Sequence, residues 1–95
     1  EITMSYKTFK DIEFTYDRDG QYSTLMFENR WGVSVTRTFA CSLGAEQGLY
    51  ELVTLDLNTN VVYNTPLKGP IGFLTEDEVT ELMIEVQNLP KKDVI

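Results

Sequence analysis

The first half of the chain alternates apolar and polar residues with the period of a β-strand. Between Asp11 and Asp17 every second side chain is apolar, and the others are acidic or carry a hydroxyl group. Successive side chains of a strand point to opposite faces of a sheet, so this segment is predicted to be a half-buried strand. Its apolar side chains are Ile12, Phe14 and Tyr16.

A hairpin is predicted to follow this strand. Asp19-Gly20 is a typical loop of a two-residue type I′ turn, and the segment from Tyr22 to Glu28 is again extended in character. With this loop, Phe14 would lie opposite Leu25, and the apolar side chains of both strands would share one face. A three-residue loop would instead send Leu25 to the acidic side.

A third strand is predicted from Val33 to Phe39, after a connection at residues 29–32. Val33, Val35 and Phe39 would face the core, and the serine and threonine residues between them would face outward. A short loop would place Leu25 across from Val35. The three strands would then form a meander with one continuous apolar face.

The longest apolar run, from Leu49 to Tyr63, is predicted to be a hairpin at the centre of the sheet. Its first strand, Leu49 to Leu57, is apolar on both faces, and residues 58–60 are turn formers that precede a second strand at residues 61–63. A strand that is apolar on both faces must be covered on both. The proline and glycine residues that follow predict a linker over residues 64–74.

Residues 75–89 carry the signature of a helix. Thr75 is the predicted N-cap, and Glu78 is placed to complete a capping box. Leu74 and Val79 would form the accompanying hydrophobic staple, and Pro90 would end the helix. Five apolar residues follow the spacing of one helix face: Val79, Leu82, Met83, Val86 and Leu89.

These elements predict one α+β domain, mainly β, over residues 1–95, with about five antiparallel strands between residues 11 and 63 and a C-terminal helix. The helix would cover one face of the sheet. The other face would be hidden in one of two ways. Either the bent meander curls into a small, partly open barrel, or a second subunit covers it.

Composition restricts the function more than it identifies it. Fifteen acidic and eight basic residues give a net charge of −7, and the basic residues are scattered, which disfavours binding to nucleic acid. Without histidine and with a single cysteine, Cys41, the chain lacks the common parts of zinc sites and catalytic triads. We therefore expect no catalytic residues, no cofactor and no metal site.

No apolar run is long enough to span a membrane, and no charged-then-apolar leader opens the chain. We therefore expect a soluble cytoplasmic protein with no membrane partner.

Candidate interaction residues come from two places. Trp31 stands beside Arg30 in a predicted hairpin loop, and this pair is typical of an interface anchor. The alternative for Trp31 is that its indole folds back over the sheet edge. Leu52 and Val62 belong to the apolar surplus of the predicted central hairpin, which a second subunit would cover.

Two resemblances concern the segments LYELVTLDLNTNVVYNTPL and GFLTEDEVTELMIEVQNLP, at residues 49–67 and 72–90. In these segments the chain resembles small uncharacterised proteins of tailed phages from marine bacteria. That resemblance implies a host-cell cytoplasmic location and no activity. The strand-rich plan is also similar to the Sm-like barrel of RNA-binding ring proteins, although those barrels usually begin with their helix, and here the helix comes last.

The expected function is a non-enzymatic interaction or assembly module, acting as a homo-oligomer whose other partners the sequence does not identify. The alternative is an Sm-like nucleic-acid-binding protein. It requires the separated basic residues to gather on one surface. These residues are Arg18, Arg30, Arg37 and Lys68.

Overall fold

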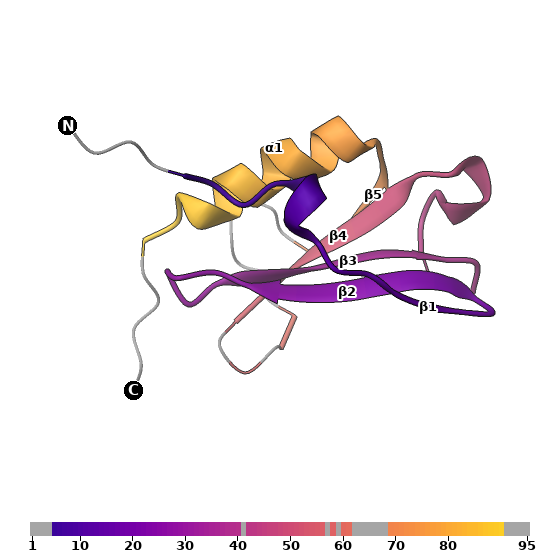
Figure 1. Cartoon of the computed structure of the whole chain (residues 1–95), viewed down its shortest axis with the longest axis horizontal. Helices are drawn as coiled ribbons and strands as arrows, with labels where there is room; N and C mark the ends of the chain where they lie inside the picture. The colour runs from indigo at the N-terminus through magenta and orange to yellow at the C-terminus, as the bar shows by residue number, and fades with distance from the viewer. Residues whose placement is uncertain (1–4, 41, 57, 59, 62–68, 91–95) are drawn as a thin grey trace.

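The computed structural model describes residues 5–40, 42–56, 58, 60–61 and 69–90. Five antiparallel strands form one sheet in the order β1-β2-β3-β4-β5, and α1 lies across one side of it (Figure 1). This arrangement confirms the predicted α+β, mainly β, fold. In chain order the elements are η1 (Phe9–Asp11), β1 (Thr15–Asp17), β2 (Gly20–Met26), β3 (Gly32–Thr38), η2 (Ala45–Gln47), β4 (Tyr50–Leu55), β5 (Ile71–Leu74) and α1 (Glu76–Gln87).

The β1–β2 hairpin has a two-residue loop, but its residues differ from those predicted. Asp17 pairs with Gly20, so the loop is Arg18-Asp19. Type I′ is wrong because it needs positive φ at both loop residues, and here the positive φ of 137° falls on Gly20. The register therefore moves by two residues. An even shift leaves each side chain on its predicted face.

The first strand is also shorter than predicted. It begins at Thr15 and not at Asp11, because Phe9–Asp11 forms a turn of 3-10 helix that bends the chain toward α1. Ile12 is nevertheless buried in the core.

The β2–β3 pairing shows the same kind of even shift. Leu25 pairs with Val33, and the predicted partner Val35 lies opposite Ser23. Val33 and Val35 are fully buried, as expected. The prediction for Phe39 is wrong: it follows the end of β3, where the alternation no longer holds, and its side chain is 63% exposed.

The predicted central hairpin is wrong in its second strand. The main partner of β4 is β5, which lies inside the predicted linker, and Val61 makes only an isolated bridge to Leu55. Residues 62 and 63 lie outside the described residues. A short strand can follow Pro70 directly because proline is tolerated before the first residue of an edge strand. The β4–β5 register also shifts between Tyr50 and Leu52, so β5 does not show the alternation that identifies longer strands.

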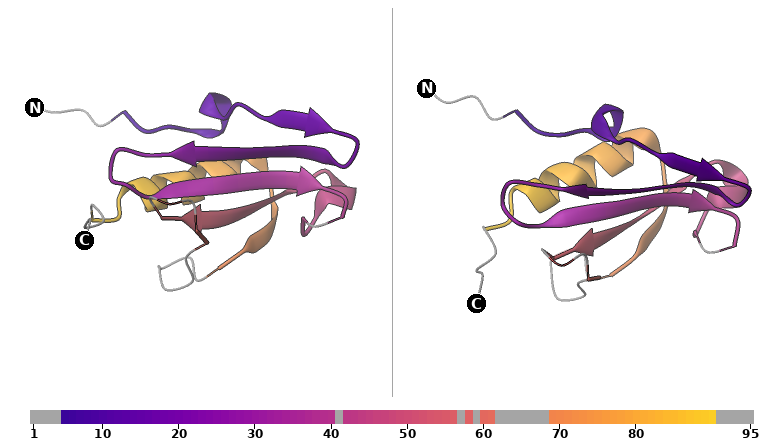
Figure 2. Two further views of the ribbon diagram at one scale, coloured as in Figure 1. Left: turned by 90° about the horizontal axis from the view of Figure 1, so that it is seen from below. Right: turned by 60° about the horizontal axis from the view of Figure 1, so that its bottom comes forward.

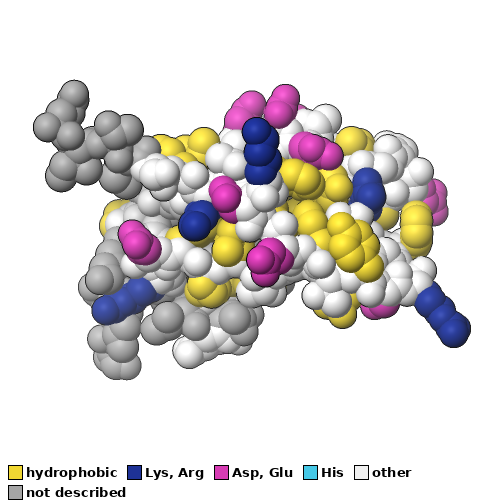
Figure 3. Space-filling view, in the orientation of Figure 1, with side chains coloured by type: hydrophobic (Ala, Val, Ile, Leu, Met, Phe, Trp, Pro, Cys, Tyr) yellow, Lys and Arg dark blue, Asp and Glu magenta, His cyan; other side chains and the backbone are white. Residues whose placement is uncertain are grey.

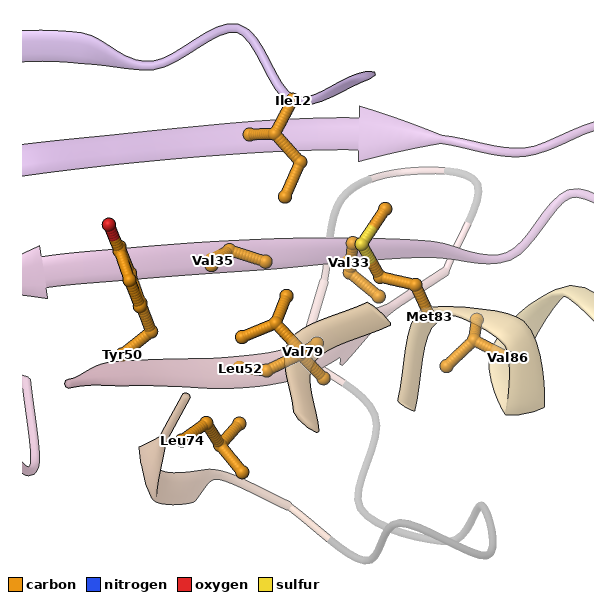
Figure 4. Packing of buried hydrophobic residues seen from close by; sticks show 9 residues of the cluster. All are labelled: Ile12, Val33, Val35, Tyr50, Leu52, Leu74, Val79, Met83 and Val86. Atoms are coloured by element: carbon orange, nitrogen blue, oxygen red, sulfur yellow. The ribbon is translucent and has the colours of Figure 1, made fainter. Parts of the chain in front are cut away.

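The helix signature is confirmed in detail. The Thr75 side chain accepts a hydrogen bond from the Glu78 backbone at 3.2 Å, and the Glu78 carboxylate accepts one from the Thr75 backbone at 2.9 Å. The helix places three fully buried side chains against the sheet, and Leu82 and Leu89 pack at the margin (Figure 4). The core cluster consists of Ile12, Val33, Val35, Tyr50, Leu52, Leu74, Val79, Met83 and Val86.

The chain before β1 is tied along α1, which the sequence pattern did not indicate. The Phe9 backbone donates to the Thr80 hydroxyl at 3.0 Å. Lys7 and Gln87 exchange two hydrogen bonds of 2.8 Å between backbone and side chain. These contacts secure the free flank of α1 beside β1.

The sheet does not close, so the barrel alternative is wrong. β1 and β5 are the two ends of the strand order and do not pair with each other. Seen from below, the sheet lies in front of the helix, and no described helix covers the near face (Figure 2). The edge strands, of three and four residues, are too short to bring the two edges together.

Two glycine substitutions separate steric conflict from backbone strain. Gly20 and Gly48 both have positive φ, but a Cβ built on Gly20 would lie 2.0 Å from the Arg37 carbonyl oxygen, whereas one on Gly48 meets nothing within 4 Å. Gly48→Ala should cost about 1 kcal/mol in the free energy of unfolding from strain alone. We expect Gly20→Ala to cost at least twice as much in urea unfolding. Equal losses would contradict the close approach of β2 to β3.

Candidate interaction surfaces

The chemistry of the chain points to surfaces and not to a reaction centre. The sequence has no histidine. The described residues contain no group of three or more metal-binding side chains. Among the helices of this part of the chain, none is both long and apolar enough to cross a membrane.

One end of the helix side is organised around Arg37. Its guanidinium lies 4.9 Å from the centre of the Tyr50 ring and donates to the Gln21 side chain at 2.7 Å and to the Gly48 carbonyl at 3.3 Å. The charge is therefore stabilised by an aromatic face and two neutral acceptors. These contacts join β2, β3, β4 and the end of η2.

An aromatic row extends from Tyr50 to the β1 edge. Phe14 lies 5.8 Å from Tyr50 and 6.5 Å from Tyr16 between ring centres, and Phe9 lies 5.1 Å from Tyr50. Such tilted and edge-on pairs add to the energy of burial. The row ends at Tyr16, which is 70% exposed. Figure 3 shows hydrophobic surface between β1 and the first half of α1.

The sequence-predicted residue Trp31 is used within the subunit. Its indole N–H donates to the Pro90 carbonyl at 2.9 Å, and its ring packs against the core cluster. Asn29, in the same loop, donates to the Val86 and Leu89 carbonyls. The β2–β3 loop thus closes the C-terminal end of α1, and the alternative in which the indole folds back is the one observed. A role of Trp31 in an interface stays a prediction.

The other three predicted interaction residues do not join Trp31 in one surface. Arg30 is adjacent, partly exposed, and holds a left-handed backbone with φ of 69°. Leu52 is fully buried in the helix-side core, where no partner reaches it. Val62 lies outside the described residues.

The basic residues required for nucleic-acid binding are not brought together. Arg18 and Arg30 lie at opposite ends of β2, whose seven residues span roughly 20 Å. Arg37 is on the helix side and bound to neutral groups, and Lys68 lies outside the described residues. The gathering on which the alternative function depends is absent among the described members.

The side of the sheet opposite α1 is the first candidate surface, here called the open face. The strand register places seven neutral residues on it. Tyr22 is 41% exposed and Met26 is 36% exposed. The charged residues that share this side, Asp17 and Glu51, stand near one end of their strands. The open face consists of Thr15, Tyr22, Thr24, Met26, Ser34, Thr36 and Val53.

Sequence reasoning missed the open face, although its signal was present. The outward positions of the second and third strands hold hydroxyl, tyrosine and methionine side chains where charged residues are usual. That pattern gains significance once the helix is known to cover the other side alone.

Leu43 and Phe73 form the second candidate surface, here called the edge pair. Leu43 is 51% exposed and Phe73 is 52% exposed, and the Phe73 N–H donates to the Leu43 carbonyl at 3.1 Å. Phe73 has a φ of 56°, which costs a residue other than glycine about 1–2 kcal/mol. Half of its ring remains in water, so burial offsets only part of that strain.

Two glycines allow the edge pair to form. A Cβ built on Gly72 would lie 2.3 Å from the Leu43 Cβ, and one on Gly44 would lie 2.9 Å from the Phe73 Cα. Only glycine fits at such distances. The backbone is therefore adapted to hold two exposed apolar side chains side by side at the β5 edge.

The fold and these surfaces define a small α+β domain built on an open antiparallel meander with one covering helix. The chain matches no protein-family model, and neither the curated proteins nor the solved structures contain a significant match to it. The resemblances to tailed-phage proteins and Sm-like barrels therefore stay predictions.

Tyr50 should give the structure a measurable pH dependence. Burial raises the pKa of its phenol above the ordinary value of 10.0, although the nearby Arg37 charge acts in the opposite direction. The folded state then holds the phenol proton more tightly than the unfolded chain does. This stabilising contribution is complete below pH 10.0 and is lost as the pH rises through the folded-state pKa.

The measurement is the difference in free energy of unfolding between wild type and Tyr50→Phe from pH 8 to 11. We expect a constant difference below pH 10, from the lost hydroxyl contact with Gln21, and a steady loss of the wild-type advantage above it. The phenylalanine variant controls for the titration of every other group. Parallel curves over the whole range would contradict the burial of this phenol.

Proposed function

We propose that the protein is a non-enzymatic assembly module that associates with a second copy of itself through the open face. The observation that carries the proposal is a sheet face without charge at its centre, in a chain of which 24% of the residues are charged. Depletion of charge, together with tyrosine and methionine, is typical of the centre of an interface.

Electrostatics favours a second copy as the partner. The net charge of −7 makes two copies repel each other over most of their surfaces. Five exposed carboxylates lie on α1, on the other side of the sheet: Glu76, Asp77, Glu78, Glu81 and Glu85. A basic partner would be attracted to that helix, whereas the open face lets two copies meet without opposing carboxylates.

The dimensions of the open face support a weak association. Five strands at ~4.8 Å spacing and ~20 Å length give roughly 500 Å² per copy, or about 1,000 Å² for a pair. That total lies at the lower limit of specific interfaces. Two such faces would pack with their strands within about 30° of parallel, as in a β-sandwich. We therefore expect a dissociation constant in the micromolar range.

Sedimentation equilibrium of the wild type and two variants tests the proposal. Thr24→Glu places a carboxylate at the centre of the open face, and Lys10→Gln makes the same change in net charge at an exposed site beside α1. We expect Thr24→Glu to weaken self-association at least tenfold, because two buried carboxylates would face each other. Lys10→Gln should leave it unchanged.

Two results would reject self-association through this face. One is a clean wild-type monomer at high micromolar concentration. The other is a dimer that both variants weaken equally, since that would place the contact elsewhere and leave only the general charge effect.

A further inference from the structure

We propose that the edge pair, Leu43 and Phe73, is a docking site for an extended peptide segment that presents apolar side chains flanked by lysine or arginine. This site is distinct from the open face, and the proposal does not depend on self-association.

The geometry indicates a site and not an accident of packing. Phe73 holds a left-handed backbone conformation that bulky residues rarely adopt, yet its ring is 52% exposed. Gly44 and Gly72 are both needed for the close contact with Leu43. The chain thus maintains a strained arrangement whose visible result is an exposed pair of large apolar side chains.

The position of the pair determines the shape of the partner. β5 is the last strand of the sheet, and no described strand pairs with its outer edge. An edge strand offers backbone donors and acceptors to another extended chain, and neighbouring apolar side chains then select that chain. The strand has only four residues, so a short peptide segment fits better than a second sheet.

The charge around the pair determines the chemistry of the partner. The Glu51 carboxylate accepts a hydrogen bond from the Leu43 backbone at 3.3 Å, and the exposed Glu46 lies three residues further along, in η2. Arg37 reaches Gly48 but lies on the helix side, over Tyr50. An acidic border on an acidic protein favours lysine or arginine in the partner and disfavours a second copy.

The test begins with a library of random seven-residue peptides displayed on phage and selected on the full-length wild-type protein. Peptides recovered from it should combine apolar residues with lysine or arginine. Their affinities for purified variants are then measured by fluorescence anisotropy. We expect binding to Phe73→Asn and to Leu43→Asn to be at least tenfold weaker than to wild type. Replacing the basic residues of a recovered peptide by glutamate should abolish its binding.

Asparagine is chosen at position 73 because it tolerates positive φ. The thermal midpoint of Phe73→Asn should therefore equal or exceed that of the wild type. Tyr22→Asn is the matched control, since it removes an exposed aromatic ring from the open face. It should weaken self-association and leave peptide binding unchanged.

Four outcomes would overturn the proposal. Recovered peptides might bind both edge-pair variants as tightly as wild type, or they might carry no basic residues. A fall of more than about 5 °C in the midpoint of Phe73→Asn would show that the ring serves folding. Loss of self-association in Phe73→Asn would make the edge pair a contact between copies.

Discussion

The packing of one short helix on one side of the sheet is the interaction on which the rest of the structure depends. Val79 and Met83 pack over β3 and β4, and this contact fixes which side of every strand is buried. A helix of twelve residues is about 18 Å long, so it covers the middle strands and not the whole sheet. The remaining tasks fall to other devices: η1 and the aromatic row beside β1, and the β2–β3 loop at the C-terminal end of α1.

What the sequence predicted correctly are the features whose cause is local. The helix from Thr75 onward could be predicted because its cap, staple and apolar stripe are all written within fifteen residues. The faces of the first three strands could be predicted because the alternation survives a register error of two. The registers themselves could not, since they depend on where the loop places its positive φ, and both Gly20 and Arg30 took that role unannounced.

The β4–β5 pairing could not be predicted for a different reason. β5 joins β4 across the long connection that follows Leu55, and its four residues include a glycine and a left-handed phenylalanine. Neither a period of two nor a turn signal marks such a strand. Its position is decided by tertiary contacts: Leu74 enters the core next to Val79, and Leu43 packs on Gly72. The predicted interaction residue Leu52 is in the core for the same reason, because α1 covers the side on which it lies.

The two candidate surfaces differ in what each requires of a partner, and this difference follows from the distribution of charge. The helix concentrates exposed carboxylates on one side of the molecule, which leaves the centre of the opposite sheet face neutral. Neutrality matters most to a partner that carries the same excess of negative charge, namely another copy. The edge pair lies among carboxylates, so its apolar side chains are accessible mainly to a chain that brings positive charge with it. One acidic domain can therefore keep self-association and recognition of a basic segment on separate surfaces.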